Sequence, residues 1–243
     1  QTLLEAAAVV EELNLLQGSA RMLEYRKQVL EKGTSRDQQL FRRNHGPWCL
    51  GTQDVRCNAL RTMPPRPAGV TAWPDDLTAT ELEGLRQRDD AAALLSPFTL
   101  VQRERGKKLV AVAPVDHPLL GPRVKRLAAL LRRAADQTGE RTLQVFLRSR
   151  ATALVSRDPL PYEDSDLDWI RLEGPWEVTV GPYETYTDPW GIKARFAIYI
   201  GRLDPKVTAR LTRYRQRLQR MERRLARLVG KRLYRARTID PRS

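Results

Sequence analysis

The chain has 243 residues, of which 41% are hydrophobic, and it can bury the core of one large domain or of two small ones. No run reaches the roughly 18 apolar residues that cross a bilayer, which argues against a transmembrane segment. Two cysteines, Cys49 and Cys57, are too few for a disulfide framework, so the expected location is a reducing cytoplasm. The first residues already show a helical pattern without a secretion signal, which suggests a start inside a larger protein.

The formal charge of +14 is concentrated at one end of the chain. Residues 206–243 hold 14 Lys and Arg against Glu222 and Asp240, a net charge of +12, whereas residues 1–205 are nearly balanced at +2. The sequence therefore predicts two parts, a nearly neutral lobe over 1–205 and a basic helix with a tail over 206–243.

Three helices are expected at the N-terminus. Apolar residues recur at helical spacing over residues 2–16. A second helix should start after a capping Ser19 and end at Gly33. A third, short helix should follow a cap at Thr34 or Ser35.

The next part of the chain is predicted to be irregular. Pro64, Pro65, Pro67 and Pro74 disfavour a regular helix in residues 44–74, and a structureless stretch of this length either wraps the core or serves a site. Residues 78–81 have the sequence of a capping box and should open a helix. Strands over 98–104 and 109–115 should form a hairpin around 105–107.

Two longer helices and a proline-containing loop come next. Apolar positions over 124–134 predict a helix that ends near Gly139, and those over 143–154 predict another. A loop with Pro159 and Pro161 should lead to the following strand. Because helices and hairpins are segregated, with no βαβ alternation, the predicted fold class is α+β with β-hairpins, a small mixed or antiparallel sheet and a long basic C-terminal helix.

Residues 174–201 are the most informative stretch of the sequence. Apolar and polar residues alternate over 176–180, as in a strand with two different faces, and Gly181-Pro182 should break that strand. A run of carboxylates and aromatics follows, and a second β-like run covers 196–200. Composition alone favours a hairpin whose carboxylates cap its own backbone N–H groups. The alternative interpretation is a binding site.

In this stretch the sequence resembles the dipeptidyl-peptidase III family of zinc metallopeptidases, and especially its bacterial hydrolase-like branch. The sequence of residues 180–184, Val-Gly-Pro-Tyr-Glu, is close to the corresponding sequence in that branch. Weaker similarity continues through Asp166, Trp169 and Asp204-Pro205, so the resemblance covers most of residues 37–222. The matched residues are Gly174-Pro175, Glu177, Gly181, Glu184, Tyr186, Asp188-Pro189, Gly191 and Phe196, with Asn44-His45-Gly46-Pro47-Trp48, Pro64-Pro65-Arg66-Pro67-Ala68-Gly69 and Trp73-Pro74-Asp75-Asp76 upstream.

The resemblance implies that this region forms one wall of a cleft that binds a peptide substrate. The strand at 176–180 would line the cleft, and Glu177 matches the glutamate that holds the substrate's N-terminal amine. Two positions depart from the family: Thr179 replaces a tyrosine of the eukaryotic enzymes, and Ala197 replaces a common glutamate. The candidate substrate-binding residues are Glu177, Thr179, Tyr183, Glu184, Tyr186 and Asp188.

The resemblance also implies zinc in a complete family member, but the zinc motif is missing from this sequence. That motif needs a His-Glu pair, a second His one turn later and a further glutamate. The chain has only His45 and His117, and neither starts the motif. We therefore expect no catalytic or metal-binding residue here. The implied function is the non-zinc, substrate-cleft portion of a metallohydrolase, a fragment inactive alone, whose partner is the missing zinc-bearing lobe.

The basic C-terminal helix offers an alternative function. Residues 206–234 should form one helix with an unbroken heptad seam. Its basic residues suggest a non-catalytic module that binds peptide or nucleic acid. Two other interpretations stay open: a seam packed on the core with a solvated basic face, and self-association through the seam. The seam consists of Val207, Leu211, Tyr214, Leu218, Met221, Leu225 and Leu228.

Overall fold

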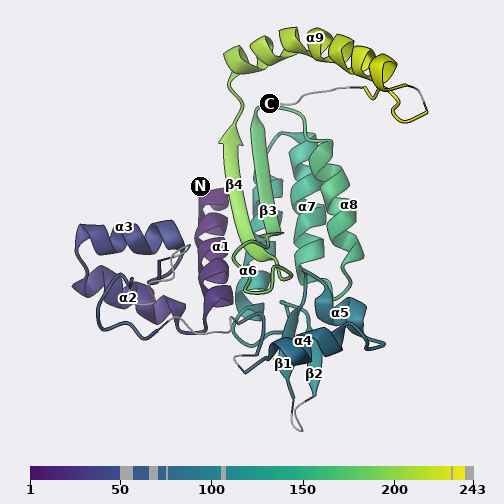
Figure 1. Cartoon of the computed structure of the whole chain (residues 1–243). Helices are drawn as coiled ribbons and strands as arrows, with labels where there is room; N and C mark the ends of the chain where they lie inside the picture. The colour runs from purple at the N-terminus through teal and green to yellow at the C-terminus, as the bar shows by residue number, and fades with distance from the viewer. Residues whose placement is uncertain (50–56, 66–70, 75, 105–107, 231, 239–243) are drawn as a thin grey trace. The chain divides into compact units, whose positions relative to one another are not determined.

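The computed structural model describes residues 1–49, 57–65, 71–74, 76–104, 108–230 and 232–238, without the side chains at 212, 213, 215 and 216 (Figure 1). It is an α+β structure with a long C-terminal helix, which confirms the predicted class. The elements in order are α1 (Thr2–Gly18), α2 (Met22–Lys32), α3 (Ser35–Asn44), α4 (Ala79–Leu85), α5 (Ala91–Leu95), β1 (Leu100–Arg103), β2 (Leu109–Val112), α6 (Gly121–Gln137), α7 (Arg141–Val155), α8 (Leu160–Ile170), β3 (Trp176–Glu184), β4 (Arg195–Arg202) and α9 (Pro205–Val229).

The chain divides into two compact units. Unit 1 comprises Gln1–Leu172 and Thr179–Tyr199. Unit 2 comprises Glu173–Val178 and Ile200–Ser243, and it contains α9. The sequence-based division at 205/206 stays a prediction.

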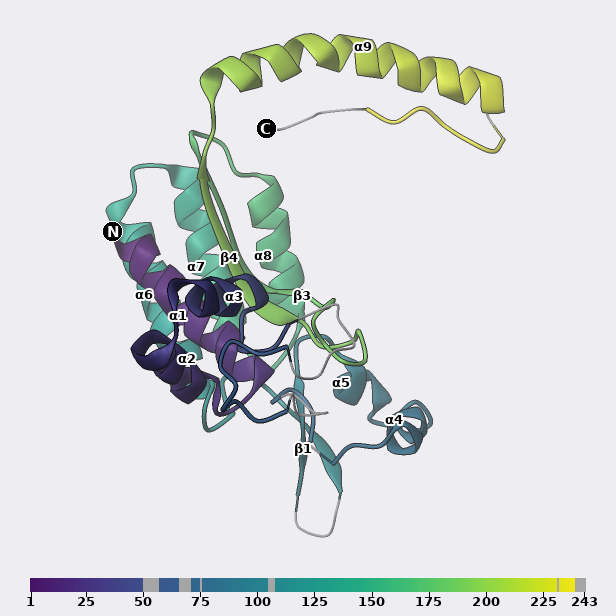
Figure 2. The ribbon, with the colours of Figure 1, turned by 60° about the vertical axis from the view of Figure 1, so that its left-hand side comes forward.

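The core of unit 1 is a layer of helices. Helix α6 packs against α1 and α7, and α7 packs against α8, as both views show (Figures 1 and 2). Leu13, Leu127, Leu131 and Phe146 are completely buried, as expected for apolar residues that recur on one helix face. Helix α6 can begin where it does because Gly121 has no side chain: a Cβ there would lie 2.4 Å from the carbonyl oxygen of Val115.

The strands of the described residues form two small sheets. Strands β1 and β2 are antiparallel, with a register from Leu100 opposite Val112 to Arg103 opposite Leu109. The predicted turn at 105–107 lies outside the described residues. Strands β3 and β4 form the second sheet. The prediction that Gly181-Pro182 breaks the first strand is wrong, because β3 continues to Glu184. Proline has no backbone N–H to donate, but in a two-stranded sheet one edge of each strand has no partner strand, so a proline can be accommodated there.

Of the two N-caps predicted for the N-terminal helices, one is confirmed and one is wrong. Thr34 caps α3 in a reciprocal capping box with Asp37, as one of the two predicted options. Ser19 does not cap α2, whose N-cap is Arg21, and the Ser19 hydroxyl instead accepts the Arg21 N–H at 3.3 Å in the preceding turn.

The described residues of the segment after α3 pack against the core, which favours one of the two alternatives predicted. Trp48 is buried against Tyr25, with the ring centroids 5.7 Å apart, and its indole N–H donates to the Pro64 carbonyl at 2.8 Å. Cys49 and Cys57 form a disulfide, with Cα atoms 5.4 Å apart, where the sequence had led us to expect reduced cysteines. Two cysteines eight positions apart close a small loop, which sequence spacing alone does not establish.

Two helices were not foreseen, and one ends earlier than predicted. The expected loop around Pro159 and Pro161 is in fact the start of α8. Proline fits there because the backbone N–H groups of a first helical turn have no acceptor within the helix, so the N–H that proline lacks is not missed. Helix α5 has only five residues, too few for a periodic signal. Helix α9 ends at Val229 because Gly230 takes a φ of 89°.

Candidate functional site

Strand β3 has the two different faces that its sequence predicts. Val178 and Val180 are completely buried, whereas Glu177 before them and Thr179 between them are half-buried. The alternation fixes the register of the strand, since a slip by one residue would bury the carboxylate of Glu177. In the part of the chain that the structure describes, this sheet consists of β3 and β4 alone.

A carboxylate and two tyrosines gather where β3 ends. The hydroxyl of Tyr199 on β4 donates a hydrogen bond to Glu184 at 3.1 Å. Hydrogen bonding to the Glu184 carboxylate raises the pKa of Tyr186 and of Tyr199. The side chain of Tyr186 is 78% exposed, which leaves most of a large aromatic surface open to a ligand.

Tyr183 is held from within the fold. Its hydroxyl donates to Asp166 of α8 at 3.0 Å, and the same carboxylate oxygen accepts a hydrogen bond from Arg150 of α7. Burial raises the pKa of Tyr183, because the phenolate would lose its solvation. The backbone contributes as well: Gly181 has a φ of 152°, and a Cβ there would lie 3.3 Å from the Tyr183 ring.

Arg150 is the completely buried centre of this arrangement. Its guanidinium carbon lies 5.5 Å from each of three ring centroids, those of Phe146, Tyr162 and Tyr183. Its Nε and Nη1 atoms have no hydrogen-bond partner among the described residues, so the charge is balanced by one carboxylate and three π faces. A buried charge of this kind ties α7, α8 and β3 together.

Asp188 is buried and organises the loop between β3 and β4. One carboxylate oxygen accepts the indole N–H of Trp73 at 2.8 Å. The other accepts backbone N–H groups of Trp190, Ile192 and Lys193 at 2.9 to 3.3 Å. The contact with Trp73 joins two of the stretches that carry the sequence resemblance.

Lys193 fixes the other end of this loop. Its buried ammonium group donates to the carbonyls of Leu94 and Ser96 at 2.7 Å and to the Thr99 hydroxyl at 3.0 Å. Burial lowers the pKa of Lys193 to about 7, while the nearby Asp188 acts in the opposite direction. Three acceptors match the three N–H groups of the protonated form.

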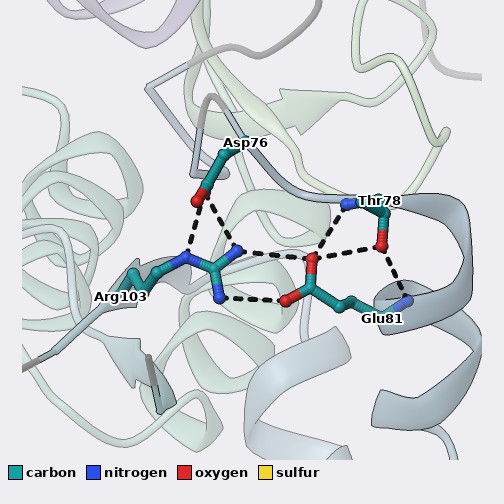
Figure 3. Close-up of polar contacts among 4 residues, drawn as sticks. All are labelled: Asp76, Thr78, Glu81 and Arg103. Atoms are coloured by element: carbon teal, nitrogen blue, oxygen red, sulfur yellow. Dashed lines mark hydrogen bonds and ion pairs between the residues drawn. The ribbon is translucent and has the colours of Figure 1, made fainter. Parts of the chain in front are cut away.

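A second polar cluster fixes the hairpin of β1 and β2 against α4 (Figure 3). Thr78 and Glu81 form the predicted capping box. The Arg103 guanidinium donates to Glu81 at 3.0 Å and to Asp76 at 3.0 Å. The hydrogen bonds that Glu81 accepts, above all those from the Arg103 side chain and then that from the Thr78 backbone, lower the pKa of Glu81 to about 2.

The predicted site residues thus divide into groups. Glu184 and Tyr186 come together with Tyr199, whereas Tyr183 and Asp188 are each held by the fold. Sequence analysis did not assign a role to Arg150 or Lys193. Arg150 did carry a signal, because it is a charged residue at a helical position otherwise occupied by apolar residues of α7. Lys193 carried none, since its partners lie almost a hundred residues away.

The histidines do not fit a zinc site. His117 is buried, and its Nδ1 accepts the N–H groups of Leu119 and Leu120 at 3.2 and 3.4 Å. Burial lowers the pKa of His117. Across the described ranges of the chain, no three His, Cys, Asp or Glu side chains are grouped to hold a metal ion. We therefore derive no metal-dependent step from these residues.

Two solved structures match this fold over nearly the whole chain. Dipeptidyl-peptidase III from Caldithrix abyssi aligns with a TM-score of 0.79 and 30% sequence identity, over 91% of this chain and 42% of that one. The enzyme from Corallococcus sp. strain EGB aligns with a TM-score of 0.77 and 30% identity, over 91% and 41%. The chain has a dipeptidyl-peptidase III-like fold. It spans less than half the length of either peptidase.

A sequence relative carries a different name. The chain is 36% identical to Nudix hydrolase 3 of Arabidopsis thaliana over 183 residues, which cover 65% of this chain and 23% of the plant protein. No family model matches the chain. Within the described residues, none of the helices is both long enough and apolar enough to cross a membrane.

Proposed function

We propose that this chain is the non-zinc, substrate-cleft portion of a dipeptidyl-peptidase-III-like metallohydrolase and that it holds a peptide along β3. The observation that carries the proposal is the likeness in fold to two dipeptidyl-peptidases III at 30% identity. The plant relative is also named a hydrolase, but this chain covers less than a quarter of it. We therefore take nothing more specific from that name.

Two features of β3 support peptide binding by strand addition. Its buried valines anchor one face, and among the described strands it pairs with β4 alone, so it is an edge strand of its sheet. An extended peptide that adds to such an edge gains main-chain hydrogen bonds. In this proposal Glu177 accepts the peptide's N-terminal ammonium group and Thr179 lies beside its first residues.

The end of β3 supplies the remaining contacts. Glu184 and the exposed ring of Tyr186 offer one charged and one aromatic contact to the peptide. Tyr183 and Asp188 support the site from within the fold, because their polar atoms already have partners there. The zinc ion and the catalytic groups belong to sequence outside these 243 residues, so the chain alone has no peptidase activity in this proposal.

The role of Glu177 can be tested with one substitution. Glu177→Gln should weaken the binding of a short peptide with a free N-terminus by about tenfold, or ~1.4 kcal/mol, because a charge-assisted contact is lost. The same peptide with an acetylated N-terminus should bind both proteins equally weakly. Calorimetric titration measures both affinities, and Glu163→Gln on α8 serves as the charge-matched control. An equal loss for the free and the acetylated peptide would contradict the assigned role.

The alternative function is a non-catalytic module that binds nucleic acid through α9. The exposed side chains of this helix and its excess of arginine favour this alternative. Binding to single-stranded DNA should then weaken steeply as salt is added, because each phosphate contact releases a counterion. Affinity that does not change between low and high salt would rule out this mode of binding.

The cytoplasmic location predicted from the cysteine count remains a proposal. The Cys49–Cys57 disulfide argues against it, because reducing compartments rarely keep such bonds.

A further inference from the structure

Unit 2 contains a basic hollow between α9 and the residues that follow it. After Gly230 the chain turns back, and residues 232–238 run alongside the helix (Figures 1 and 2). The turn is built on Gly230, whose φ of 89° favours glycine and whose carbonyl accepts the N–H groups of Leu233 and Tyr234 at 3.0 Å. The returning segment and the last turns of α9 border an open hollow of about 720 Å³.

One carboxylate holds the returning segment in place. Glu222 accepts hydrogen bonds from the Tyr234 hydroxyl at 2.5 Å and from the Arg237 backbone N–H at 3.0 Å. The Gln219 side chain donates to the Arg237 carbonyl at 2.9 Å. The Arg237 N–H and the Tyr234 hydroxyl lower the pKa of Glu222. Glu222 is the single acidic residue between Pro205 and Thr238 in the sequence, and it faces the returning segment.

The hollow is lined by arginines without acidic partners. Arg223 and Arg227 come from α9, where a spacing of four places them on the same face, and Arg235 comes from the returning segment. No described carboxylate lies within ion-pair distance of these three side chains, although Arg227 Nε donates to the Arg223 carbonyl at 3.4 Å. The other lining residues are Ala226, Tyr234 and Ala236.

We propose that this hollow is a binding site for a small ligand that carries several phosphate groups. A guanidinium group matches the oxygens of a phosphate with two parallel N–H donors, and three arginines line this hollow. The volume lies within the roughly 300 to 1,000 Å³ typical of ligand pockets and exceeds the needs of one phosphate. The short side chains of Ala226 and Ala236 leave room for a phosphate chain to approach the arginines. None of the residues that line the hollow belongs to β3.

The test titrates inorganic tripolyphosphate into the full chain and follows binding by calorimetry. The wild type should bind one equivalent saturably. Arg227→Gln and Arg235→Gln should each weaken binding about tenfold, as expected for the loss of one charge-assisted contact. Arg210→Gln removes the same charge from α9 outside the hollow and should change the affinity less than about twofold. Circular dichroism of each variant confirms that the helix is retained.

A charge-neutral variant separates a built site from general attraction. Tyr234→Phe removes the hydroxyl that Glu222 accepts and should release the returning segment, so tripolyphosphate binding should fall although no charge changes. Equal losses for Arg210→Gln and Arg227→Gln, or no effect of Tyr234→Phe, would overturn the proposal. Single-stranded DNA serves as the second probe, and tripolyphosphate should displace it only from the hollow. DNA binding without any tripolyphosphate binding would also overturn the proposal. Peptide affinity should not change in these variants, so failure here is distinguishable from failure of the cleft.

Discussion

Arg150 in unit 1 and the arginines of α9 in unit 2 use the same side chain in opposite ways. Arg150 is completely buried, shares the Asp166 carboxylate with Tyr183 and lies among three aromatic rings. Arg223 and Arg227 are exposed and have no described acidic partner. Arg150 therefore maintains the fold, whereas the exposed Arg223 and Arg227 are the groups that we propose bind a ligand.

The largest expected effect compares these two kinds of arginine directly. Arg150→Ala should lower the free energy of unfolding by about 3 to 5 kcal/mol, because it leaves a cavity among three rings and removes the partner of Asp166. Arg210→Ala, an exposed position on α9, should change it by about 0.5 kcal/mol or less. Urea denaturation measures both values. Similar values for the two variants would break the comparison.

A buried lysine provides the next test in unit 1. Lys193→Met should cost about 2 to 4 kcal/mol, because it leaves the Leu94 and Ser96 carbonyls without their donor. Its effect should also depend on pH. Folding lowers the pKa of Lys193 from 10.5 to about 7, so between these values the unfolded chain binds more protons than the folded one. The advantage of the wild type over the variant should therefore grow from pH 7 to pH 10. A difference in stability that does not change with pH would show that the three hydrogen-bond acceptors keep the pKa of Lys193 at its ordinary value.

The smallest expected effect concerns the half-exposed cluster around Arg103. Its guanidinium holds the pKa of Glu81 at about 2, so Glu81 contributes stability above its ordinary pKa of 4.5 that is lost as the pH falls to about 2. Arg103→Gln should move the Glu81 pKa back toward 4.5 and reduce this loss. Carboxyl NMR titration of Glu81 measures the shift, with Glu83 as the control. An unchanged Glu81 pKa would assign the effect to the Thr78 cap alone.

Local sequence signals predicted much of the fold. The caps at Thr34 and Thr78 and the apolar spacing of α6 and α7 were sufficient, because each of these features depends on residues within a few positions. Helix α8 was missed because its prolines resemble helix breakers, and they fit only in the first turn. Strand β3 was predicted too short for the same reason, since Pro182 is harmless at an edge.

The candidate site was predictable only in part. The alternation along β3 was visible in the sequence, as was the polar character of the residues that follow it. The anchoring of Asp188 by Trp73 and of Lys193 by Leu94 was not, because each contact joins residues about a hundred positions apart. The return of the chain onto α9 depends on Glu222 and Tyr234, which no motif connects.

Peptide binding along β3 can be mapped residue by residue with amide NMR of the isotopically labelled chain. Titration with a short peptide carrying a free N-terminus should shift the amide signals of residues 177–186 and leave those of α9 unchanged. Tripolyphosphate should shift residues 222–238 in the same sample and leave β3 unchanged. Peptide-induced shifts confined to α9, or none along β3 at saturating peptide, would contradict the account.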